Sequence, residues 1–331
     1  MGSNYPPETN TVLTNVDPMK WPSANIKSDA GAALLLALWA LFLLGAMVIA
    51  WAININSGLA FSSTANRAFE AQAMASSGAN VALSREITPS SPNLHKQMGN
   101  GESYDVRITG ECGRLNLNFL TQGEDPSKLQ ILRQYLNLKG IDLNDLDVMM
   151  DSLLDWVSPN KGLQHMNACP ESDNYHPAHA PLASVDELKK ICGWSEFTSK
   201  PGWDEDFTIV GACGAIDLAY ASRDVLRALG IPDDFVDRFL QLRQGPDGID
   251  GTADDAQMDQ QTAFALLGLN NPRAPLLQGG IQSLVVFGSP NAVFRILSAG
   301  KSGDVTRSVE MVVQKQVLGI GHPQVFSWKE L

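Results

Sequence analysis

The chain has 331 residues, enough for a membrane anchor and one or two globular lobes with cores of their own. Its net charge of −12 and its lack of a Lys/Arg-rich run exclude sustained nucleic-acid binding, because phosphate neutralisation requires a basic face. The sequence contains no nucleotide-binding loop, nucleophile elbow or activated triad, so we expect a non-enzymatic protein.

The first predicted element is a membrane anchor. From Ala30 to Asn66 there is no formally charged residue, and Ala32–Ile53 is apolar over roughly the 20 residues that cross a bilayer as a helix. Lys20 and Lys27 precede this run and Arg67 is the next basic residue, which predicts a cytoplasmic N-terminus. A cleaved secretory signal peptide is the alternative, but its apolar core should span only about 7–15 residues. We therefore expect a retained single-pass anchor.

The helix should continue beyond the membrane. Residues 61–87 contain no proline, are rich in alanine, and place Leu59, Phe69 and Leu83 on one helical stripe. Pro89 ends the pattern. We predict one continuous helix over residues 32–87, with residues 32–53 in lipid and the remainder packed on another part of the chain.

Both ends of the exported part predict antiparallel strands. Tyr104–Ile108 alternates apolar and polar side chains, as a half-buried strand does. Val293–Ser298 and Val305–Val313 alternate in the same way and are joined by Gly300–Gly303, which indicates a hairpin. The prediction is a core formed by residues 88–109 and 276–331.

Between these strands the sequence is mostly helical, and we predict an inserted helical domain over residues 110–275. Ser184 and Ser222 are expected N-caps. Residues 110–119 and 211–220 also form a weak repeat, in which Cys112 and Cys213 are equivalent. The expected helices are 129–138, 146–156, 185–192, 222–229 and 233–243.

The four cysteines favour two disulfides, because an even number in an exported domain is typical of paired thiols. Sequence alone allows three connectivities. Repeat equivalence favours Cys112–Cys213, and Cys169–Cys192 would then close a long Pro-rich loop. A zinc site is the alternative, although the spacings fit no common zinc pattern; its candidate ligands are His165, Cys169, His176, His179 and Cys192.

The densest acidic feature is the Gly-rich segment 245–255, which we call the acidic loop. It carries Asp247, Asp250, Asp254 and Asp255. Calcium takes six to eight oxygen ligands on flexible backbone, so this segment is a candidate calcium site, although its spacing is not that of an EF-hand. The alternative is a solvated polar turn whose aspartates bond to nearby backbone.

Gly31–Trp39 resembles the start of type IV pilins and type II secretion pseudopilins. In that class a prepilin peptidase cuts after the glycine and methylates the new terminus, which implies a leader of residues 1–31 and a mature chain beginning at Ala32. Most members carry glutamate at the fifth mature position, which is Leu36 here. This departure resembles the K-type minor pseudopilins, general secretion pathway protein K. A buried carboxylate in lipid needs a cationic partner, and a subunit with no neighbour above it needs no such group.

The resemblance extends along the chain. It implies an α+β pilin-like fold, with the long helix on an antiparallel sheet and a large helical insertion, and it implies calcium binding in the helical domain. The matching stretches are 112–118, 153–156, 180–188, 193–194, 214–218 and 223–229.

The resemblance also implies a function, namely the tip of the type II secretion pseudopilus, where the subunit initiates and caps fibre assembly. Implied partners are other minor pseudopilins, the major pseudopilin, the prepilin peptidase and the inner-membrane assembly platform, with no nucleic acid. The implied location is the bacterial inner membrane, with the C-terminal domain in the periplasm. The alternatives are a minor pilin of a type IV pilus or DNA-uptake system, and a membrane-tethered calcium-binding module.

Overall fold

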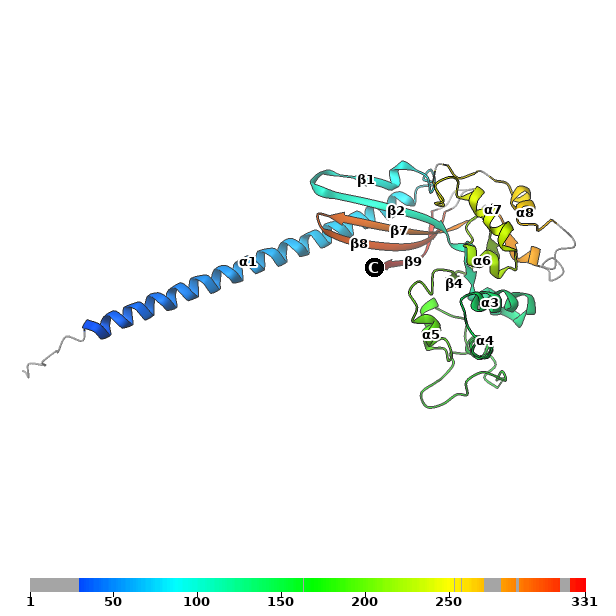
Figure 1. The fold of residues 1–331 in the computed structure, drawn as a ribbon, viewed down its shortest axis with the longest axis horizontal. Coiled ribbons are helices and arrows are strands. Elements are labelled where there is room, and N and C mark those ends of the chain that lie inside the picture. Colours follow the sequence, from blue (N-terminus) through cyan, green and yellow to red (C-terminus); the bar gives the residue numbers. More distant parts are fainter. Residues whose placement is uncertain are drawn as a thin grey trace, which may run out of the picture. The chain divides into compact units, whose positions relative to one another are not determined.

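A long helix, α1 (Ala30–Ala82), opens the part of the chain that the computed structural model describes (Figure 1). The described residues are 30–162, 164–252, 254–256, 258–270, 281–289, 292–315 and 322–331. The predicted leader therefore lies outside them except for its last two residues. The chain divides into two units, residues 1–62 and 63–331, and each is described by itself.

The first unit contains the N-terminal part of α1. Gly31–Ile53 is long and apolar enough to cross a membrane by length and composition, and it is the one such stretch in the described residues. Its side chains are exposed, as expected where lipid rather than protein is the solvent. The structure therefore contains the apolar helix that the membrane-anchor prediction requires.

The second unit contains a five-stranded antiparallel sheet in the order β1-β2-β7-β8-β9. The predicted strands and hairpin are confirmed, but β7 and β8 run further than expected. Ser302 pairs with Val305, so the hairpin turns at Gly303 and Asp304. The bounds are β1 His95–Gln97, β2 Glu102–Gly110, β7 Val293–Ser302, β8 Val305–Gln314 and β9 Gln324–Glu330.

The second half of α1 packs on this sheet through small residues. Ala75, Ala79 and Ala82 are buried against a set of sheet side chains that includes Ile296 and Met311. Because alanine adds little bulk, the helix axis can approach the strands closely. α1 ends at Ala82, short of the predicted residue 87, and tight turns follow it.

The closest approach is at Gly300 on β7. A Cβ placed on Gly300 would lie 2.1 Å from the backbone oxygen of Ala71 and 2.2 Å from the backbone nitrogen of Ala75. Gly78 on α1 faces the sheet in a similar way, with Ser298 beneath it. The absence of side chains at these two glycines is what lets the helix lie directly on the sheet.

The chain leaves the sheet after β2, forms a mainly helical insertion, and returns at β7 (Figure 1). The predicted helices at α3, α4, α6 and α7 are confirmed, whereas 185–192 is a shorter 3₁₀ helix. Ser184 and Ser222 accept N-cap hydrogen bonds as predicted. The main bounds are α2 Leu117–Thr121, α3 Pro126–Leu138, α4 Leu143–Val157, η5 Val185–Lys190, α5 Ser195–Thr198, α6 Arg223–Ala228, α7 Asp233–Arg243 and α8 Gln260–Leu266. Short 3₁₀ turns complete it, η3 Glu111–Gly113, η4 Gln122–Glu124 and η7 Ile281–Leu284, and η1 Pro92–Leu94 and η2 Gly99–Gly101 flank β1.

The weak sequence repeat corresponds to a structural one. β3 (Leu115–Asn116) pairs in parallel with β4 (Phe207–Thr208), and β5 (Ile216–Asp217) pairs in parallel with β6 (Val285–Val286). β3 and β5 occupy equivalent positions in the two repeated stretches. The insertion has its own core, in which Tyr135, Trp194 and Phe207 make edge-to-face contacts.

Candidate functional site

The residues of the predicted processing site lie in the first turns of α1. Among the described residues, no atom lies within 4 Å of a Cβ placed on Gly31, and Leu36 is 71% exposed. Cleavage between Gly31 and Ala32, and methylation of Ala32, remain predictions.

The acidic loop follows α7 and is tied to it by an ion pair. Arg243, which is buried, donates to the carboxylate of Asp250 from Nε at 2.9 Å and Nη2 at 3.0 Å. The same guanidinium donates to the carbonyls of Leu218 and Ala221. Gln244 donates to Asp250 as well. Asp250 is therefore the counter-ion that lets Arg243 hold the link between β5 and α6.

The remaining aspartates organise the loop itself. Asp254 accepts from the backbone of Asp247 at 3.2 Å and from the hydroxyl of Thr252 at 2.7 Å. Asp255 accepts from the backbone of Gly251 at 2.7 Å. The Thr252 hydroxyl and then the Asp247 backbone lower the pKa of the exposed Asp254 carboxyl. These are the bonds expected of a polar turn.

Asp250 differs from the other three candidate calcium ligands. It already neutralises Arg243, whereas no ion pair to Asp247, Asp254 or Asp255 occurs among the described residues. In the described parts of the chain, no three acidic, histidine or cysteine side chains form a metal-binding group. Calcium binding by the acidic loop therefore remains a prediction that rests on Asp247, Asp254 and Asp255.

The acidic loop also contacts the turn after α1. A Cβ on Gly251 would lie 3.1 Å from Cβ of Pro89, and a cavity of about 390 Å³ is lined by both segments together with Tyr220. The loop therefore lies where the insertion meets the helix–sheet core. A change in the loop's rigidity would therefore alter the packing at this junction.

Both expected disulfides are present. Cys112 and Cys213 have Cα atoms 4.9 Å apart, and Cys169 and Cys192 have Cα atoms 6.2 Å apart. Cys112–Cys213 lies against Val293 at the start of β7, so it joins the insertion to the sheet. The cysteines that the zinc alternative required are oxidised and bonded to each other.

A buried charge network at the same junction was not predicted. Glu111 is 1% exposed and accepts from Arg295 at 2.7 and 2.9 Å, with Arg114 3.5 Å away. Burial raises the pKa of the Glu111 carboxyl, but the bonds and charges of Arg295 and Arg114 outweigh burial and lower it. Arg295 also contacts Glu310 on β8. Glu111 and Arg295 are 184 residues apart, so no local pattern could have paired them.

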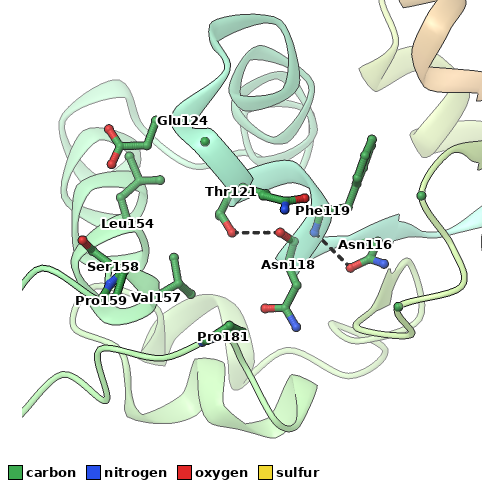
Figure 2. Close-up of a pocket in the computed structure, with 14 residues that line it drawn as sticks. Asn116, Asn118, Phe119, Thr121, Glu124, Leu154, Val157, Ser158, Pro159 and Pro181 are labelled. Carbon is green, nitrogen blue, oxygen red and sulfur yellow. Dashed lines mark hydrogen bonds between the residues drawn. The ribbon is translucent and has the colours of Figure 1, made fainter.

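The two asparagines of the first repeat hold the insertion together. Asn116 donates to the carbonyls of Val210 and Cys213, and Asn118 exchanges two bonds with the backbone of Leu182. Figure 2 shows both beside a cavity of about 690 Å³, and shows Asn116 accepting from the backbone of Phe119. These asparagines act structurally, by replacing backbone partners that the short strands lack.

The fold described above, a long N-terminal helix on an antiparallel sheet with a helical insertion, defines a pilin-like subunit. A family model described as type II secretion system protein K matches residues 113–200, which run from η3 past α5. The fold is also similar to a chain in the crystal structure of the GspK-GspI-GspJ complex from the type 2 secretion system of enterotoxigenic Escherichia coli. That match has a TM-score of 0.57 and 14% identity, and covers 84% of this chain and 99% of that chain.

No curated protein matches the sequence. The family model and the structural likeness together support a member of the type II secretion system protein K family, a minor pseudopilin.

Proposed function

We propose that this protein is the tip subunit of the type II secretion pseudopilus, where it initiates and caps fibre assembly. The observation that carries the proposal is the size of the insertion, which enters after β2 and leaves at β7 of a pilin-like sheet. A subunit enlarged in this way is too bulky to repeat along a thin fibre. Leu36 supports the same position, since a tip subunit has no neighbour above it to neutralise a carboxylate.

Its setting follows from the anchor. The apolar helix would cross the inner membrane with the N-terminus in the cytoplasm, and the disulfides suit an oxidising periplasm. A prepilin peptidase would remove residues 1–31. We assign the chain no catalytic role, so the energy for extrusion must come from a separate assembly ATPase acting through the inner-membrane platform.

The partners would be other minor pseudopilins and the major pseudopilin. The similar crystal structure is a complex that contains GspI and GspJ, which supports corresponding subunits as neighbours of this chain. The comparisons do not support a type IV pilus, DNA-uptake or stand-alone calcium-binding protein.

The test is co-purification of the tagged full-length protein from detergent-solubilised membranes. We expect other pilin-like chains to co-purify in equal amounts, and immunogold labelling to mark one end of each pseudopilus. Leu36→Val should retain this behaviour, and Leu36→Glu should reduce it. Labelling along the length of the fibre, or efficient assembly of Leu36→Glu at internal positions, would refute the tip assignment.

Calcium would rigidify the acidic loop by removing repulsion among Asp247, Asp254 and Asp255. Binding to the folded state alone adds roughly 2.7 kcal/mol of stability at a hundredfold excess over Kd. In thermal melts of the full-length protein with chelator, calcium or magnesium, we expect calcium to raise the melting temperature. Asp254→Ala should abolish this increase, whereas Asp173→Ala, a control at an exposed position, should retain it. If calcium does not change the melting temperature, the acidic loop is a polar turn and not a calcium site.

A further inference from the structure

Two carboxylates on one face of α4 hold the long loop that follows it. Asp151 accepts from the backbone and the side chain of Asn167, both at 2.9 Å, and Asp155 accepts from the backbone of His165 at 3.1 Å. Ser152 accepts from the backbone of Cys169 between them. Asp151 and Asp155 therefore fix the described part of the segment 158–181.

His165 joins this segment to a third element. Its ring Nδ1 lies 2.5 Å from Oδ1 of Asp155, and its Nε2 lies 3.3 Å from Oε2 of Glu124 in η4. The Asp155 side chain is 7% exposed, whereas that of Glu124 is 46% exposed. One imidazole ring thus bridges a buried carboxylate on α4 and a half-exposed carboxylate on η4.

This arrangement depends on the protonation state of His165. A neutral imidazole has one N–H, so it can donate to one carboxylate and must turn a lone pair toward the other. Only the imidazolium donates to both. On deprotonation the remaining proton should stay with Asp155, which is closer and buried, and the contact with Glu124 should be lost.

The bridge reaches the 690 Å³ cavity through Glu124. Glu124 lines that cavity from one side, and Ser158, Pro159 and Pro181, at the two ends of the segment, line it from another (Figure 2). We infer that His165 is a pH-dependent latch, which holds the segment 158–181 to η4 when protonated and releases that edge of the cavity when neutral.

The charged groups around His165 favour the closed form. Carboxylates face it from α4 and η4, and Lys161 and Glu171 share the adjoining hollow with Asp155. His179 in the same hollow is itself bonded to Glu171 at 2.9 Å. Burial lowers the pKa of His165, but the bonds to Asp155 and Glu124 outweigh burial and raise it. The latch is therefore closed below the ordinary histidine pKa and opens as pH rises through the raised value.

The test uses the full-length protein in detergent micelles. Exchange of the His165 ring C2 hydrogen, followed by mass spectrometry, gives its pKa, and amide exchange of peptides from 158–181 reports the latch between about pH 5.5 and pH 8.5, a window that spans the histidine range. We expect amide protection to fall several-fold across the His165 titration, after correction for intrinsic rates. Glu124→Gln should lower the measured pKa of His165 and reduce the fall in amide protection across the titration.

Two further variants separate the latch from general loop stability. His165→Gln should give protection that no longer changes with pH, and Glu171→Gln, which removes the partner of His179 instead, should keep the step. Unchanged amide protection across the titration in the unmutated protein would overturn the inference. So would a step of equal size in His165→Gln, or a His165 pKa that Glu124→Gln leaves in place.

Discussion

Replacing Gly300 with alanine tests how α1 is seated on the sheet. The new Cβ would lie 2.1 Å from the oxygen of Ala71, 2.2 Å from the nitrogen of Ala75 and 2.9 Å from its Cα. All three are helix backbone atoms, so no side-chain rotation can relieve the contact. Restoring ordinary van der Waals separation requires α1 and β7 to move apart by about 1 Å or more.

The cost follows from that displacement. Overpacking a core typically costs about 1–3 kcal/mol, and a gap of this size also forfeits a quarter to a half of each dispersion contact along the seam. We expect Gly300→Ala to lower the free energy of unfolding by about 3 kcal/mol. For a unit of this size, that corresponds to a fall of roughly 6–12 °C in Tm.

Circular dichroism of the full-length protein in detergent, heated or titrated with urea, measures the change. Gly99→Ala is the matched control, because no atom lies near its Cβ position, and it should stay within about 0.5 kcal/mol. Gly78→Ala should fall between them, since it meets mainly side chains and gains about 1 kcal/mol of helix propensity. If Gly300→Ala unfolds like Gly99→Ala, α1 does not rest on β7 as described.

Three further predictions concern processing, cross-linking and pH. Mass spectrometry of the mature protein should find a methylated N-terminus at Ala32. A mature chain that begins after the apolar segment would lack the membrane helix and would refute the pilin interpretation. Non-reducing peptide mapping should recover a Cys112–Cys213 peptide, and a peptide joining Cys112 to another cysteine would contradict it. Burial lowers the pKa of Lys315, whose Nζ donates to the Ile87 carbonyl, to about 8. The unfolded state then binds the extra proton between about pH 8 and pH 10.4, so urea stability should rise over that window and Lys315→Met should abolish the rise.

The elements that could be predicted are those whose signal is local. The alternation in Val305–Val313 shows which face of the strand is buried, and the alanine-rich run of α1 does the same for the helix. Both elements could therefore be predicted from the sequence. β9 was missed because a bulge opposite Val312 and Val313 interrupts its register with β8. Its sequence therefore lacks the strict alternation by which a strand is recognised.

The candidate sites were predictable to a lesser degree. The pairing of Cys112 with Cys213 followed from the repeat, since equivalent positions came together. The engagement of Asp250 by Arg243 did not follow, because the arginine lies in a preceding helix whose face depends on tertiary packing. The Glu111–Arg295 pair joins η3 to the distant strand β7, and long-range contacts leave no trace in a single sequence.

The place where the insertion joins the sheet has a consequence for folding. Gly110 at the end of β2 pairs with Phe294 near the start of β7, so the two ends of the insertion are adjacent. While the intervening chain is unfolded, pairing β2 with β7 must close a very long loop. Once the insertion has folded, Cys112–Cys213 ties its start to β5, and β5 pairs with β6 close to its end, so most of that entropy has already been lost. The pilin sheet should therefore form last, so that a subunit whose helical lobe is misfolded never presents a finished core to the fibre.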